Sequence, residues 1–148
     1  MRLLEATRIG MCAGLLAFCE LGQAQVVVDL AAGIHRIRAE VANTYGSRAQ
    51  GLMQRTSLPT NGGMLFVFDR LAEHCMWMRN TLIPLSVAFL DEHGQLINVE
   101  EMLPQTEDNH CAAKPAKFAL EMNAGWFKAK GVNAGGSIAG IEKAPPAR

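Results

Sequence analysis

Apolar residues in this chain fall in short runs that are separated by polar, glycine-containing or proline-containing connections. Short runs of this kind, several of them alternating between apolar and polar positions, are typical of β-strands. The most regular alternation occurs over 117–123, where Glu121 faces away from the apolar side chains of Phe118, Leu120 and Met122. The pattern predicts strands over 26–30, 34–41, 64–68, 74–79, 85–90, 95–102, 117–123 and, most weakly, 137–141.

Two short helices are predicted between these strands. One covers 47–54, after the capping residues Asn43 and Thr44, and the other covers 126–130, where Gly131 ends it. The spacing between strands is too short for a series of βαβ units. The sequence therefore predicts a mainly β (α+β) fold, a compact antiparallel β-sandwich or barrel with two short helices.

The first 24 residues have the pattern of a signal peptide. Arg2 and Arg8 precede an apolar run over 9–21, and the small-x-small triplet 22–24 follows it. The run is too short for a typical spanning helix, which needs about 20 apolar residues. We expect cleavage before Gln25 and a periplasmic or secreted protein without a membrane span. An uncleaved N-terminal anchor is the alternative, because Glu20 is unusual so near a cleavage site.

Composition limits the function classes. The chain has 14 Lys and Arg residues against 14 Asp and Glu residues, which argues against a strongly basic nucleic-acid-binding protein. Its 49% hydrophobic residues are ordinary for a globular chain. We expect a single globular domain over 25–148 that is monomeric and does not bind nucleic acid.

Two cysteines remain after the predicted cleavage. Cys75 and Cys111 form an even number in an oxidising compartment, which predicts a disulfide bond between them. We expect the bond to join the 104–115 loop to a central strand. Two buried free thiols are the alternative.

Four sequence blocks occur in a characteristic order, namely 51–55 (GLMQR), 63–66 (GMLF), 77–85 (WMRNTLIPL) and 120–125 (LEMNAG). Over 36–141 the chain resembles the family called domain of unknown function 192. The resemblance implies a compact β-rich fold with short helices and no settled activity. The family usually has a Gly-Asp pair before the last strand, whereas this chain has Gly136 followed by Ser137.

Metal binding is the first chemistry to consider, because His74-Cys75 and His110-Cys111 could supply ligands. Adjacent side chains in a strand point to opposite faces, and bonded cysteines supply no thiolate. The methionines lie at apolar positions, where methionine usually fills the core. We therefore predict no metal site and no cofactor.

A group of polar and aromatic residues on otherwise apolar elements forms the candidate ligand site: Arg55, Trp77, Arg79, Asn80, Thr81, Glu121 and Asn123. Their role could be structural, with Asn80 and Thr81 bonding turn backbone. It could also be functional, with the polar groups orienting a small ligand. In both cases a carboxylate at Glu121 needs a partner, and we expect Arg55 or Arg79 within salt-bridge distance of it.

Two functions remain open. The first is an exported, non-catalytic module that binds a small ligand or a cell-envelope component. The alternative is a cell-envelope hydrolase or transferase that uses Glu121 as acid or base. A deep pocket with a raised Glu121 pKa would favour the enzyme, and a salt bridge on a shallow face would favour the binding module.

Overall fold

The computed structural model describes residues 25–148. The predicted signal peptide over 1–24 lies outside the described residues. The elements in chain order are β1 (Val27–Ala32), β2 (His35–Ala42), α1 (Tyr45–Gln50), β3 (Gly62–Ala72), β4 (Cys75–Met76), β5 (Leu85–Leu90), β6 (Leu96–Met102), β7 (His110–Cys111), β8 (Ala116–Asn123), α2 (Trp126–Ala129), β9 (Ile138–Ala139) and a 3-10 turn η1 (Ile141–Lys143).

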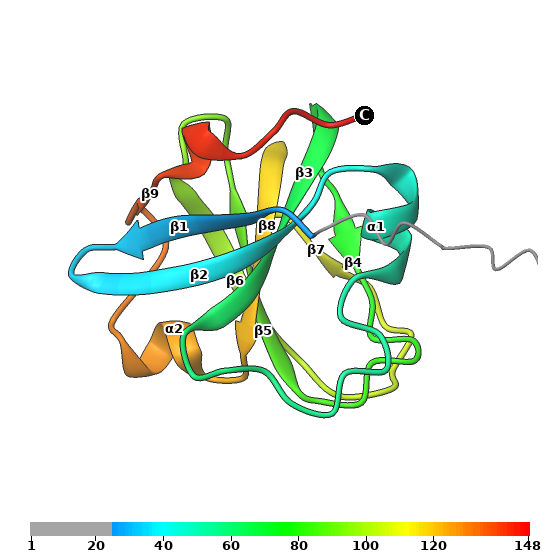
Figure 1. Ribbon diagram of the computed structural model, residues 1–148. Helices are drawn as coiled ribbons and strands as arrows, with labels where there is room; N and C mark the ends of the chain where they lie inside the picture. The colour runs from blue at the N-terminus through cyan, green and yellow to red at the C-terminus, as the bar shows by residue number, and fades with distance from the viewer. Residues whose placement is uncertain (1–24) are drawn as a thin grey trace, which may run out of the picture.

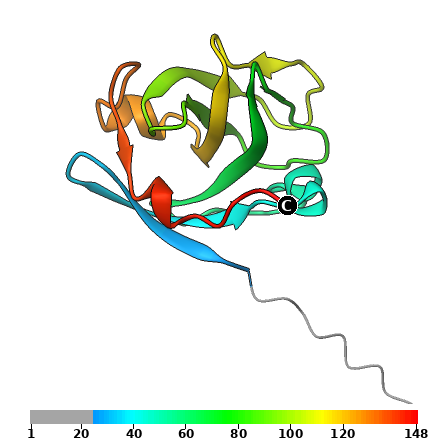
Figure 2. The ribbon, with the colours of Figure 1, turned by 90° about the horizontal axis from the view of Figure 1, so that it is seen from above.

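Seven strands form one curled sheet in the order β6-β5-β8-β3-β2-β1-β9 (Figure 1). A bridge between Gln95 and Ser137 brings the beginning of β6 next to the beginning of β9, so the two ends of the sheet approach each other. Seen from above, the sheet curls around an interior (Figure 2). The predicted mainly β fold with two short helices is confirmed.

One strand pair differs from the expected antiparallel arrangement. β2 and β3 are parallel, in the register Arg38 to Gly62 through Ala42 to Phe66. Parallel neighbours need a crossover connection, and here that crossover contains α1. The sequence pattern missed it because α1 is short and most of the connection is irregular.

Helix α1 has the expected Thr44 cap, but it begins at Tyr45, two residues before the predicted start, and it ends earlier than predicted. The Thr44 side chain accepts a hydrogen bond from the Ser47 amide, and the Ser47 hydroxyl accepts one from the Thr44 amide, a reciprocal cap. The helix ends at Gln50 rather than at residue 54, because Gly51 adopts a φ of 48°. A Cβ on Gly51 would lie 3.2 Å from the Phe66 ring.

Apolar side chains cover both faces of the sheet. The interior cluster includes Leu120 and Met122 of β8. The outer cluster includes Phe66 of β3 and Ala119 of β8, and it is covered by Leu52 and by residues of the segments that follow β4 and β7. The predicted alternation of β8 is therefore confirmed. Because both faces are covered, Glu121 lies in an apolar layer and not on a solvated one.

The predicted disulfide is confirmed, since Cys75 is bonded to Cys111 with a Cα–Cα distance of 4.0 Å. The two residues are register partners in a separate two-stranded ladder of β4 and β7. We expected the bond to join the 104–115 loop to a central strand, and that expectation is wrong. Only Cys75 and Met76 of the predicted 74–79 strand form a ladder, and they lie outside the main sheet.

Candidate functional site

Glu121 is a carboxylic acid in the middle of the sheet. It lies on β8 and is directly opposite Met64 of β3 and Val87 of β5. Both of these neighbours are buried and apolar, so the sheet supplies no side-chain donor beside it. Glu121 is only 3% exposed. Among residues 25–148, no side chain or backbone amide makes a hydrogen bond or ion pair with its carboxyl group. The carboxyl oxygens are not sealed in the interior, because they open to a pocket.

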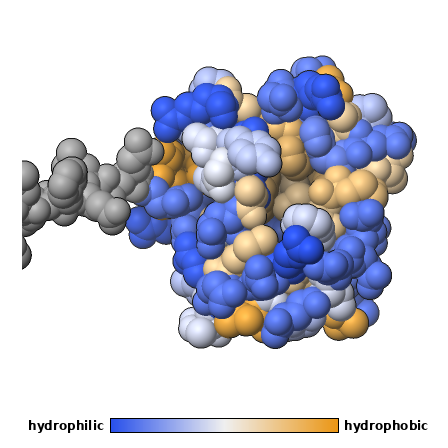
Figure 3. All heavy atoms as spheres, turned by 90° about the vertical axis from the view of Figure 1, so that its right-hand side faces the viewer, coloured by the Kyte–Doolittle hydropathy of each residue, from blue (hydrophilic) through white to orange (hydrophobic). Residues whose placement is uncertain are grey.

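The Glu121 side chain reaches the wall of a pocket between α1, β3 and the segment that begins with β4. The pocket has a volume of about 240 Å³. Figure 3 faces the α1 and β4 side of the molecule, where apolar side chains gather in a recess bordered by polar ones. The lining consists of Tyr45, Arg48, Ala49, Gln50, Gly51, Leu52, Met53, Phe66, Phe68, Cys75, Met76, Trp77, Thr81 and Glu121.

Burial raises the pKa of Glu121 from its usual 4.5 to about 8. The cause is the loss of water around the charged form, since no nearby cation or donor compensates for that loss. At neutral pH the group is therefore mostly a neutral carboxylic acid, which can donate one hydrogen bond and accept others. This is the one strongly perturbed acid among the described residues, and it opens to a pocket.

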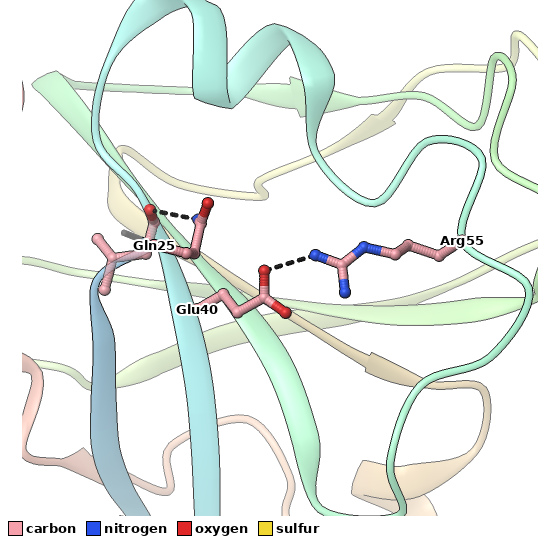
Figure 4. A network of polar contacts seen from close by, with 4 residues as sticks. Gln25, Glu40 and Arg55 are labelled. Carbon is pink, nitrogen blue, oxygen red and sulfur yellow. Dashed lines mark hydrogen bonds and ion pairs between the residues drawn. The ribbon is translucent and has the colours of Figure 1, made fainter. Parts of the chain in front are cut away.

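Neither of the two expected arginines approaches Glu121, so the predicted salt bridge is wrong. Arg55 instead pairs with Glu40 of β2, with 2.5 Å between Nη2 and Oε2 (Figure 4). Arg79 pairs with Glu107, with 2.6 Å between Nε and Oε1. Both arginines pair with acids that are distant in sequence and more exposed than Glu121. A buried position beside Glu121 would have required a guanidinium group to leave water.

Arg79 also lies over the aromatic ring of Trp77, with 5.0 Å from its guanidinium carbon to the ring centroid. Trp77 is 48% exposed and forms part of the pocket wall. The arginine therefore supports the outside of this wall rather than entering the pocket.

Asn80 and Thr81 connect the loops around the pocket. Asn80 adopts a φ of 54°, and its carbonyl accepts a hydrogen bond from the Gln54 amide at 2.9 Å. The buried Thr81 donates its hydroxyl to the Arg79 carbonyl at 3.3 Å, and its own carbonyl accepts from the Gln105 amide. The Thr81 hydroxyl therefore bonds turn backbone, as the structural interpretation requires, whereas Asn80 contributes its main-chain carbonyl.

Asn123, at the end of β8, also bonds the backbone of a loop. Its side-chain amide donates to the carbonyl oxygens of Leu58 and Pro59, at 3.2 Å and 3.0 Å. Asn123 thereby holds the connection between α1 and β3 against the sheet, and its side chain is not part of the pocket lining.

Of the seven residues singled out in the sequence, the pocket brings together Trp77, Thr81 and Glu121. Arg55, Arg79, Asn80 and Asn123 lie outside its lining. Sequence reasoning missed most of the wall, including Phe66 and Phe68 of β3. Their period-two spacing places them on one strand face, which was visible in the sequence. Their position in the same pocket as Glu121 depends on strand pairing, which was not visible in the sequence.

The described part of the chain contains no group of three or more His, Cys, Asp or Glu side chains arranged to hold a metal ion. His74 instead stacks on Phe68, with ring centroids 3.7 Å apart, and its Nε2 lies 3.0 Å from the Arg70 carbonyl. Over the same residues, no helix has the length and apolar character needed to cross a membrane.

The sequence profile of the DUF192 family, described as Uncharacterized ACR, matches residues 26–140. The chain belongs to the DUF192 family. This finding confirms the resemblance noted in the sequence. The family description names no activity, so the function has to be inferred from the pocket.

Two solved structures are similar to this DUF192 chain. A Sinorhizobium meliloti 1021 protein, provisionally described as a transcription regulator, is 32% identical, with 79% of this chain and 95% of that chain covered and a TM-score of 0.75. A protein of unknown function from Novosphingobium aromaticivorans DSM 12444 is 33% identical, with 77% and 84% covered and a TM-score of 0.71. No curated protein matches the chain.

Proposed function

We propose that this protein is a binding module for a small organic ligand and that the ligand enters the pocket beside α1. The observation that carries the proposal is Glu121, a buried carboxyl group without a partner in the described chain that opens to an apolar pocket. A carboxyl group that is held away from bulk water, without a protein donor, costs folding free energy. A ligand that bonds to this group would recover part of that cost, which gives an otherwise unfavourable residue a function.

The size of the pocket limits the ligand. Engineered protein cavities of about 150 Å³ hold benzene. A volume of about 240 Å³ therefore fits a ligand only somewhat larger than one six-membered ring. Apolar wall residues such as Phe66 and Met76 would contact its body, while Glu121 would fix its orientation.

A fragment screen followed by amide NMR tests this proposal. Small ring compounds should shift the signals of residues that line the pocket, including Gly51, Phe66 and Glu121. Ala49→Trp places a large side chain in the lining and should abolish those shifts. Ala129→Trp is the matched control, since Ala129 is also an exposed helical alanine but lies on α2, outside this pocket. Shifts scattered over the surface, or unchanged in Ala49→Trp, would contradict the proposal.

The enzyme alternative has one observation in its favour, which is the raised pKa of Glu121 in a pocket. An acid of this kind is suited to donate a proton near neutral pH. However, hydrolysis by paired carboxylates needs a second acid, and Glu121 is the only carboxylic acid in the lining. Hydrolysis of nitrophenyl esters or glycosides that is lost in Glu121→Gln would favour the enzyme over the binding module.

The module is proposed to work after export, with Gln25 as its first residue. The Cys75–Cys111 bond supports an oxidising compartment. The Gln25 side chain donates to the Val41 carbonyl at 3.1 Å, so the proposed first residue already contacts β2 (Figure 4). Intact-mass measurement on the protein recovered from periplasm or culture medium tests the proposal. A mass that includes residues 1–24 would refute it.

A further inference from the structure

We infer that the ligand of this pocket is a small organic amine, held by an ion pair between its ammonium group and the Glu121 carboxylate. The inference rests on the proposed function and adds the chemical class of the ligand. Its basis is the combination of an unpartnered carboxyl group, only 3% exposed, with walls that are otherwise mainly apolar.

The neighbours of Glu121 leave its carboxyl group without a donor. Met64 and Val87 flank it in the sheet, and neither carries a polar hydrogen. Thr81 also lines the pocket, but its hydroxyl already donates to the Arg79 carbonyl. What the site lacks is therefore a donor, and an ammonium group supplies three donors together with a positive charge.

The other ionisable groups that face the pocket are both on α1. Arg48 donates from Nη1 to the Val67 carbonyl at 3.1 Å, and it makes no ion pair with Glu121. Tyr45 carries a phenol and is largely exposed. The covering segment from β4 adds Cys75, which is bonded to Cys111 and does not titrate. Glu121 is thus the only group in the lining that can become negatively charged at moderate pH.

Aromatic rings provide the surface for the rest of the ligand. Phe66, Phe68 and Trp77 all belong to the lining. Trp77 already holds the Arg79 guanidinium over one face, which shows that this ring accepts a cation. An amine carried on a single ring satisfies both the apolar walls and the size of the pocket.

Binding of the amine must release a proton. Before binding, Glu121 is mostly protonated at about pH 7 and the free amine is an ammonium ion, whereas the complex holds only the ammonium proton beside a carboxylate. Close to one proton is therefore released for each ligand bound. With the Glu121 pKa at about 8, affinity for the amine should rise about fifty-fold between about pH 6 and about pH 8.

Calorimetric titration with matched ligand pairs tests the inference: benzylamine against benzyl alcohol, and phenethylamine against 2-phenylethanol. At about pH 8 each amine should bind at least about tenfold more tightly than its alcohol, because a charge-assisted hydrogen bond is stronger than a neutral one. Titrations at about pH 7, in buffers of different ionisation enthalpy, measure the released proton. Glu121→Gln should remove the preference for the amine and the proton release but retain binding of the alcohol. Glu142→Gln, which changes an exposed glutamate of η1, is the control and should alter neither.

The outcomes separate this inference from the proposed function. If the alcohols bind in the pocket as tightly as the amines, or if amines bind without releasing a proton, the amine class is wrong and the binding module stands. If neither the amines nor the alcohols shift the NMR signals of the lining residues, both the inference and the proposed function are overturned.

Discussion

Replacing Glu121 with Gln should change how the stability of the protein depends on pH. In the folded protein burial raises the pKa of Glu121 to about 8, whereas the unfolded chain has the usual 4.5. The folded state therefore holds a proton that the unfolded state releases over this pH range. The free energy of unfolding should fall as pH rises from about 4.5 to about 8, since each pH unit in this range costs about 1.4 kcal/mol.

The full effect is the pKa difference multiplied by that slope, about 5 kcal/mol between acidic and alkaline conditions. Glu121→Gln keeps the shape of the neutral acid and cannot ionise. Below about pH 5 the variant and the wild type should differ little, and above about pH 8 the variant should be the more stable protein.

Urea denaturation followed by circular dichroism at several pH values measures both proteins under the same conditions. The difference between their pH profiles cancels the contributions of all other titrating groups. Glu142→Gln should follow the wild type throughout, because this glutamate is exposed and does not line the pocket. Parallel profiles for wild type and Glu121→Gln would refute the conclusion that this carboxyl group is buried without a partner.

Three further predictions concern stability. Reduction of the Cys75–Cys111 bond should lower the free energy of unfolding by about 4 kcal/mol, because a crosslink of sequence separation 36 restricts the unfolded chain. Urea titration with and without reductant measures this change, and a variant with both cysteines replaced by Ala should be insensitive to reductant. Gly63→Ala should strongly destabilise the protein in thermal melts, because a Cβ there would lie 2.5 Å from a carbonyl oxygen of β8. Gly46→Ala in α1 is the control: its Cβ would meet no atom within 4 Å, and the change should stabilise the protein by about 0.5–1 kcal/mol. Asn123→Ala should cost about 1–2 kcal/mol in the same melts and leave fragment binding unchanged; lost binding in a folded Asn123→Ala protein would instead place this residue in the site.

The pocket explains why the two functions considered from the sequence could not be separated there. Each required an environment for Glu121 that the sequence leaves open. The binding module was expected to have a salt bridge at Glu121, and the enzyme was expected to have a pocket with a raised Glu121 pKa. The structure contains the pocket and the raised pKa without the salt bridge. It also places no second acid in the lining, so the pocket suits ligand recognition better than catalysis by two carboxylates.

Several features of this protein were determined by the sequence alone. The alternation over 117–123 placed Glu121 on the other face of the strand from Leu120 and Met122, and the structure agrees. The blocks around Trp77 identified the family over nearly the whole domain. Strand faces and caps of this kind depend on residues only a few positions apart. Their physical causes, side-chain alternation and local hydrogen bonding, are therefore contained in a short stretch of sequence.

The partners of the charged residues were decided only by the tertiary structure. Arg55 bonds to Glu40 on β2, and Arg79 bonds to Glu107 in a distant loop, so neither reaches Glu121. The parallel pairing of β2 with β3 likewise has no local signature. Which strands become neighbours, and in which register, depends on the burial of apolar surface over the whole domain. That long-range pairing surrounds Glu121 with apolar side chains and opens it to a pocket, which no pattern along the chain could predict.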